Sequence, residues 1–81
     1  MNKNKNVYKF EIIERVICAR PFDTKEEVVE LAKKMRDIAL DNDDYSEDVK
    51  QAFRDAYKEI KDELSLSNLK EIKKIIDDDE D

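Results

Sequence analysis

The chain has 81 residues, of which 47% are charged, with a net charge of −6, no histidine and no glycine. This length limits it to one small domain, and its excess of acids disfavours direct binding to nucleic acid or to anionic membrane surfaces. The lack of glycine excludes phosphate loops and dinucleotide-binding fingerprints, and the lack of histidine removes the imidazole base and every histidine-containing metal site.

The apolar residues, 40% of the chain, are patterned rather than scattered, which is typical of a folded domain. Tight hairpins usually need glycine at positive φ, whereas helices can be joined by Asn, Asp and Ser turns. We therefore predict an all-α fold, a small bundle of three to four amphipathic helices. The predicted domain covers residues 1–76, with 1–6 frayed, and residues 77–81 form a solvated acidic C-terminal tail.

The most apolar stretch, residues 7–22, predicts a first helix over residues 7–19 that ends before Pro21. Its apolar arc consists of Phe10, Ile12, Ile13, Val16, Ile17 and Ala19. The opposite side consists of Glu11, Glu14, Arg15 and Cys18. Lys9 falls in the middle of the arc, so we expect the helix to begin near it or just after it. Apolar and charged residues alternate over residues 7–10, which leaves a short extended start as the alternative.

A second helix is predicted over residues 24–40. Asp23 or Thr24 can cap it, and Glu26 or Glu27 can complete a capping box. Its expected buried stripe is Val28, Leu31, Ala32, Met35, Ile38 and Ala39.

Residues 41–45 read as a turn, and Ser46 is a suitable N-cap for a third helix that runs to about Leu64. Its expected buried residues are Val49, Ala52, Phe53, Ala56, Tyr57, Ile60 and Leu64. Ala52 and Ala56 form a shallow strip where a neighbouring helix can approach closely. Ser67 is expected to cap a short fourth helix. That helix carries Leu69, Ile72, Ile75 and Ile76.

The residue types predict neither an enzyme nor a cofactor or metal site. The acidic run from Asp41 to Asp48 suggests a calcium loop, but the positions that need glycine and glutamate hold Ser46 and Ala52. Cys18 has no histidine to activate it, and we expect a small residue at the edge of a helix face. A single cysteine favours a reducing, cytoplasmic location. No run reaches membrane-spanning length, and charges interrupt any signal-peptide core.

The charges of the second and third predicted helices are sorted by sign, and these acidic faces are the candidate partner-binding surface. The candidate residues are Glu26, Glu30, Asp37, Asp41, Asp43, Asp44, Asp48, Asp55, Glu59 and Asp62. We predict a non-enzymatic interaction module, an inhibitor or regulator that binds another protein with a basic surface. In one version the carboxylates imitate a phosphate backbone and occupy the basic channel of a nucleic-acid enzyme. The plainer interpretation is a solvated surface that keeps the protein soluble.

Apolar surface supports an alternative function, a self-associating structural domain. The first helix has a broader apolar arc than one covering layer needs, and a homodimer could bury it. Val29 and Leu40 lie on a shoulder outside the expected stripe of the second helix. Tyr8, Tyr45 and Tyr57 are candidate anchors for a partner. Monomer and homodimer both remain open at this point.

Overall fold

The computed structural model describes residues 5–79, and within them it contains helices and no strand. The elements are α1 (Lys5–Ala19), α2 (Lys25–Leu40), α3 (Glu47–Lys58), the single π-helical turn η1 (Glu59–Glu63) and α4 (Leu66–Asp79). The predicted all-α bundle is therefore confirmed.

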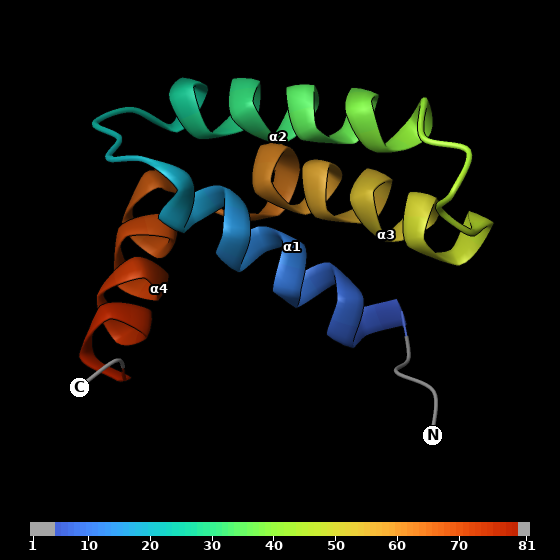
Figure 1. The fold of residues 1–81 in the computed structure, drawn as a ribbon. Helices are drawn as coiled ribbons and strands as arrows, with labels where there is room; N and C mark the ends of the chain where they lie inside the picture. The colour runs from blue at the N-terminus through green and yellow to red at the C-terminus, as the bar shows by residue number, and fades with distance from the viewer. Residues whose placement is uncertain (1–4, 80–81) are drawn as a thin grey trace.

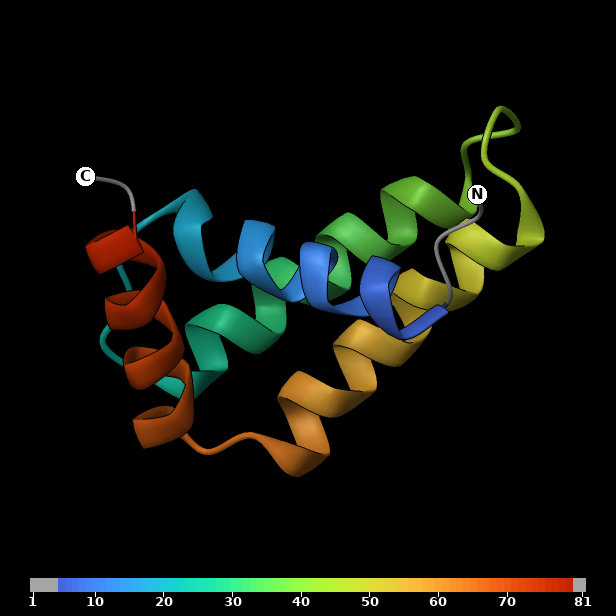
Figure 2. The same ribbon diagram turned by 90° about the horizontal axis from the view of Figure 1, so that it is seen from below.

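Two of the four described α-helices form a pair, a third lies across that pair, and the fourth covers one end of it. α2 and α3 run antiparallel beside each other, α1 packs across both, and α4 lies across the end where α1 stops and α2 starts (Figures 1 and 2). The turn between α2 and α3 lies at the opposite end. This arrangement leaves one long side of α2 and most of α4 facing solvent.

The core forms where α1 meets the α2–α3 pair. Its buried residues are Ile12, Ile13, Val16, Ile17, Val28, Ala32, Ala52, Ala56, Ile60 and Leu69. Four of the ten come from α1, which confirms that this stretch is the main apolar contributor. Burying one isoleucine side chain contributes about 1.5–3 kcal/mol, so α1 supplies a large share of the stabilisation.

The N-terminal part of α1 differs from the prediction in three respects. The helix begins at Lys5, two residues before the predicted start, so the helix predicted over residues 7–10 is confirmed against the extended alternative, and residues 5 and 6 are helical rather than frayed; residues 1–4 lie outside the described part. Lys9 lies within the helix rather than at its start, and its Nζ reaches Glu59 Oε1 at 3.3 Å. A lysine can bury its aliphatic stem while its amine reaches a partner, which explains its place in the apolar arc. Phe10, predicted to be buried, is 56% exposed.

The buried stripe of α2 is turned relative to the predicted one. Val28, Ala32 and Ala39 are buried, but Ile38 is 69% exposed, and Val29, predicted to lie off the stripe, packs against the core. At 100° per residue, the three buried residues lie within about 40° of one another, and Ile38 lies about 80° from Val28. Because α2 packs closely against its neighbours at Ala32 and Ala39, Ile38 lies at the edge of this interface, where solvent reaches it.

Two of the predicted N-caps are confirmed. Thr24 caps α2, with its Oγ1 accepting from the Glu27 amide at 3.4 Å, while Glu27 Oε2 accepts from the Asp23 amide at 3.1 Å. Ser46 caps α3, and its Oγ accepts from the Val49 amide at 3.4 Å. These caps position the two ends of the α2–α3 pair.

The end of the third predicted helix differs from regular α-helix. Residues Glu59–Glu63 form a π-helical turn, the Leu64 amide donates to the Glu59 carbonyl at 3.0 Å, and Leu64 is extended. Helices often end at a glycine with positive φ, but no described residue has positive φ. The chain therefore leaves the helix here without a positive φ, and Leu64 packs against the core.

The cap of α4 is Ser65, so the prediction of Ser67 was wrong. Ser65 Oγ accepts from the Asn68 amide at 3.1 Å, and Asn68 Oδ1 accepts from the Ser65 amide at 3.1 Å. This reciprocal pair is a capping box with asparagine in the place of glutamate. At its other end α4 continues through Asp79, three residues into the segment expected to be an unstructured tail; residues 80–81 lie outside the described part. Ile75, expected to be buried, is 58% exposed.

The corrected cap leads to a stability prediction. Ser65→Ala should lower the free energy of unfolding by about 1 kcal/mol, because it leaves the Asn68 amide without its acceptor. Ser67→Ala, two residues further along the chain, should change it by less than about 0.5 kcal/mol. Urea unfolding followed by circular dichroism measures both values. Equal losses for the two variants would contradict the assignment of the cap.

Candidate interaction surfaces

The acidic residues of α2 form a ridge that faces away from the bundle. We use the term outer ridge for Glu26, Glu30, Asp37 and Asp41. All four side chains are exposed and lie on the helix face opposite the buried Val28, Ala32 and Ala39. Within the outer ridge, Asp37 Oδ1 pairs with Arg36 Nη2 at 2.9 Å. The outer ridge is accessible to a partner along its whole length.

The acidic residues of α3 and η1 lie on a different side of the molecule. Glu59 pairs with Lys9 of α1, and Asp55 Oδ1 accepts from Gln51 Nε2 at 2.9 Å; both carboxylates are half-buried. Tyr57 lies on the opposite flank of α3, beneath the Arg36 guanidinium of α2. Asp62 is exposed and lies in η1, whereas Asp48 lies in the first turn of α3, next to the turn from α2. Asp55 and Glu59 therefore face the α1 side, and the structure does not join them with the outer ridge into one surface.

The turn between α2 and α3 extends the outer ridge. Residues 41–48 contain five acids and no base, and all five carboxylates are exposed. Asn42 Oδ1 accepts from the Asp44 amide at 2.9 Å, which shapes the turn. We call Asp41, Asp43, Asp44, Glu47 and Asp48 the acidic turn. Of the ten predicted residues, the structure groups those of the outer ridge and the acidic turn, and it sets Asp55, Glu59 and Asp62 apart.

An apolar groove that sequence reasoning missed lies beside the acidic turn. Tyr45 stacks on Phe53 with ring centroids 6.0 Å apart and an angle of 15° between the ring planes. Two shallow hollows, of about 250 Å³ and about 180 Å³, share both rings and Arg15. We call this the aromatic groove; its main lining residues are Arg15, Met35, Ile38, Tyr45, Val49 and Phe53. The interruption of an acidic run by Tyr45 was the available sequence signal.

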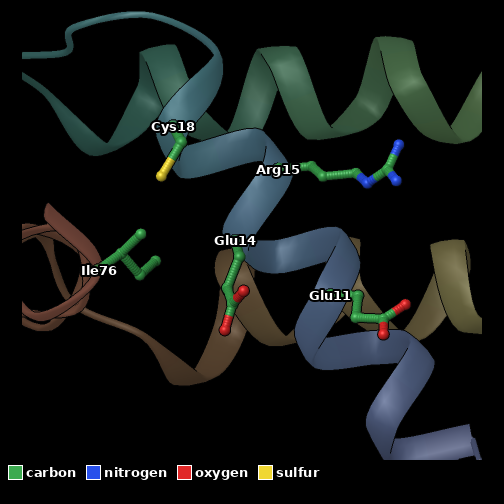
Figure 3. A pocket seen from close by; sticks show the side chains of 5 residues that line it. All are labelled: Glu11, Glu14, Arg15, Cys18 and Ile76. Atoms are coloured by element: carbon green, nitrogen blue, oxygen red, sulfur yellow. The ribbon is translucent and has the colours of Figure 1, made fainter. Parts of the chain in front are cut away.

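A third hollow, of about 410 Å³, lies between α1 and α4. Cys18 of α1 points toward Ile76 of α4, Glu14 extends downward from α1, and Glu11 and Arg15 extend toward the other side of α1 (Figure 3). The Cys18 side chain is exposed. The lining therefore consists of two carboxylates, one guanidinium, one thiol and one isoleucine.

The three candidate tyrosine anchors have different environments. Tyr45 is 40% exposed, whereas Tyr57 is half-buried with the Arg36 guanidinium 4.5 Å and the Lys61 amine 5.8 Å from its ring centroid. Tyr8 is half-buried and lines the smaller hollow of the aromatic groove. Tyr45 therefore presents the most accessible ring of the three.

The apolar arc of α1 is used mainly inside the molecule. Ile12, Ile13, Val16 and Ile17 are at most 8% exposed, and Phe10 remains at the surface. Leu40, predicted to form a shoulder on α2, is half-buried. The homodimer stays a prediction, and the apolar area that α1 could offer to it is centred on Phe10.

Comparisons with protein-family models, with curated proteins and with solved structures found no match. Within residues 5–79, no three or more Cys, Asp or Glu side chains are grouped so that they could hold a metal ion. None of the described helices combines the length and the apolar character that crossing a membrane requires. The surfaces of the molecule are therefore the basis for a functional proposal.

Proposed function

We propose that this protein is a non-enzymatic interaction module, an inhibitor or regulator, that binds a partner protein with a basic surface. The partner contacts the outer ridge and the acidic turn. The observation that supports this most is the accessibility of the acidic turn, where five exposed carboxylates lie in eight consecutive residues without a single base. Such a local field accelerates the encounter with a positively charged partner and orients it.

The acids on the α1 side of α3 have a different role in this proposal. Asp55 and Glu59 already accept hydrogen bonds from Gln51 and Lys9, and their carboxylates are half-buried. A partner that used them would have to compete with these internal contacts. Both residues therefore contribute to the overall negative potential, while direct contacts come from the outer ridge and the acidic turn.

The charge density of the outer ridge is too low to imitate duplex DNA closely, and it fits a short basic patch on a partner protein better. From Glu26 to Asp41 the helix rises about 22 Å, at 1.5 Å per residue. Duplex DNA of that length carries about 13 negative charges. The outer ridge has four acids over this distance, and Lys33 and Lys34 lie beside it. A basic channel that evolved for DNA would therefore be matched only in part, whereas a short basic patch on a protein could be matched well.

The proposal is tested by capture of a partner followed by charge neutralisation. The immobilised protein is exposed to lysate of its source cells, and proteins released by salt are identified by mass spectrometry. The association rate of a purified partner is then measured for the triple variant Glu30→Gln, Asp41→Asn and Asp43→Asn. We expect the rate to fall about tenfold or more at low ionic strength, because steering depends on these charges, and the difference to shrink in high salt.

A matched control separates local contact from net charge. The triple variant Glu71→Gln, Asp77→Asn and Asp78→Asn removes the same three charges from exposed positions on α4. We expect this control to retain most of the association rate. If the association rate falls equally in both triple variants, the effect comes from net charge and not from local contact. If the rate falls in neither variant, the acidic surface is not the binding site.

A further inference from the structure

The aromatic groove has the properties of an anchor site beside the acidic turn. It lies between α1, the C-terminal half of α2 and the N-terminal half of α3, at the opposite end of the bundle from α4. Ile38 is 69% exposed and Tyr45 is 40% exposed, so the groove presents a large apolar side chain and an aromatic ring to solvent. Tyr45 stacks on Phe53, so the two rings present one aromatic surface to the groove.

We propose that the aromatic groove binds a basic segment of the partner that presents a large apolar side chain. This inference rests on the proposed function, and it deepens it by naming the kind of segment recognised. The apolar side chain packs against Ile38, Tyr45 and Phe53, and flanking lysines or arginines of the segment face the acidic turn. The groove supplies apolar burial, and the acidic turn supplies charge complementarity.

The shallow shape of the groove argues for a side chain rather than a small molecule. Small-molecule sites are usually concave and bury most of the ligand surface. The two hollows here, of about 250 Å³ and about 180 Å³, are both shallow and open to solvent, so they would enclose little of such a ligand. Because they share Tyr45, Phe53 and Arg15, they form one continuous strip along which a helical or extended segment can lie.

The charges around the groove specify the sign of the segment. Within the acidic turn, Tyr45 directly follows Asp44 and precedes Glu47 by two residues. The lining itself is not acidic: the smaller hollow has Arg15 and Glu11, and Arg15 is the charged residue of the larger one. The negative charge that favours a basic segment over an acidic one therefore comes from the exposed carboxylates of the acidic turn on both sides of Tyr45.

A distinct partner fits these charges better than a second copy of the chain. The basic part of this protein is residues 1–20, where Phe10 is exposed beside Lys9, but Lys9 already pairs with Glu59. Insertion of Phe10 into the groove of another copy would be a head-to-tail contact, which propagates into open chains unless the rotation closes. The net charge of −6 on each copy also opposes it.

The test uses peptide probes of defined chemistry and nuclear magnetic resonance of the full chain. One probe is a short helical peptide of leucine and lysine with the leucines on one face. A second probe has alanine in place of leucine with the same charge, and a third has glutamate in place of lysine. We expect the first probe alone to bind well and to shift the amide signals of Ile38, Tyr45 and Phe53.

Variants then assign the contact to the groove. Ile38→Ala combined with Tyr45→Ala should weaken binding of the leucine–lysine probe about tenfold or more, because both are exposed lining residues at the centre of the contact. Ile75→Ala removes a comparably exposed isoleucine from α4 and should leave binding unchanged. Circular dichroism checks that each variant remains folded.

The alternative outcomes overturn this inference in recognisable ways. If the alanine–lysine probe binds as tightly as the leucine–lysine probe, the acidic surface acts without the groove, and the proposed function stands alone. If the leucine–lysine probe does not bind, the groove is not an anchor site, while partner capture still decides the proposed function. If sedimentation detects self-association that Phe10→Ala abolishes and that protects the groove amides, a second copy is the occupant.

Discussion

Replacing Ile17 by alanine is expected to lower the free energy of unfolding by about 2–5 kcal/mol. Ile17 has no exposed surface and belongs to the core where α1 meets the other helices. The substitution removes buried methyl and methylene groups, and the helices around the site cannot move together fully to fill the space. Both the lost burial and the remaining cavity therefore reduce stability.

A loss of this size matters because the domain is small. Folded domains are stable by about 5–15 kcal/mol, and at this chain length each 1 kcal/mol corresponds to about 4–8 °C in Tm. Ile17→Ala should therefore lower Tm by about 10 °C or more. Thermal and urea unfolding followed by circular dichroism measure the change. Ile75→Ala, at a site that is 58% exposed, is the control and should cost far less. Similar losses in the two variants would mean that α1 is not central to the core.

Enlarging Ala56 to leucine is expected to cost about 1–3 kcal/mol or more. Ala56 is 1% exposed and Ala52 is not exposed, and both lie on the side of α3 that packs against its neighbours. Leucine and alanine both favour helices, so the change acts mainly through packing rather than through helix propensity. The added side chain must separate α3 from a neighbouring helix or adopt a strained rotamer.

The matched control for Ala56→Leu is Ala19→Leu, because Ala19 is exposed at the end of α1. This control should change the free energy of unfolding by less than about 0.5 kcal/mol. Urea unfolding of both variants gives the comparison. A neutral or stabilising effect of Ala56→Leu would show that the alanine strip of α3 is not a site of close helix approach.

The interaction surfaces were only partly predictable. Eight of the ten acidic candidates were found from their spacing, because residues three, four and seven apart share a helix face, and Asp43 and Asp44 were added from the acidic turn. Their division into the outer ridge with the acidic turn and the acids on the α1 side depends on how α3 is rotated between α1 and α2. That rotation follows from packing at Ala52, Ala56 and Ile60. It cannot be predicted from the helical wheel of a single helix, because it depends on the neighbouring helices.

The aromatic groove illustrates the same limit. Ile38 fits the helical period of a buried stripe, and only the close packing at Ala32 and Ala39 leaves it exposed at the rim. Tyr45 lies in a polar turn with no periodicity, and its stacking on Phe53 depends on the path of the turn. Both residues acquire their role from neighbours that are distant in the sequence or on another element.

Local sequence was enough to predict the helical class, the central contribution of residues 12–17 and the cap at Ser46, and it narrowed the cap of α2 to Asp23 or Thr24. These features depend on apolar period and on hydrogen bonds between residues three or four apart, so local sequence contains them. The tertiary structure alone decided the exposure of Ile38 and Phe10, the pairing of Lys9 with Glu59, and the separation of the two acidic surfaces. These features depend on the relative rotation of packed helices, which is set by side-chain volumes meeting across the core.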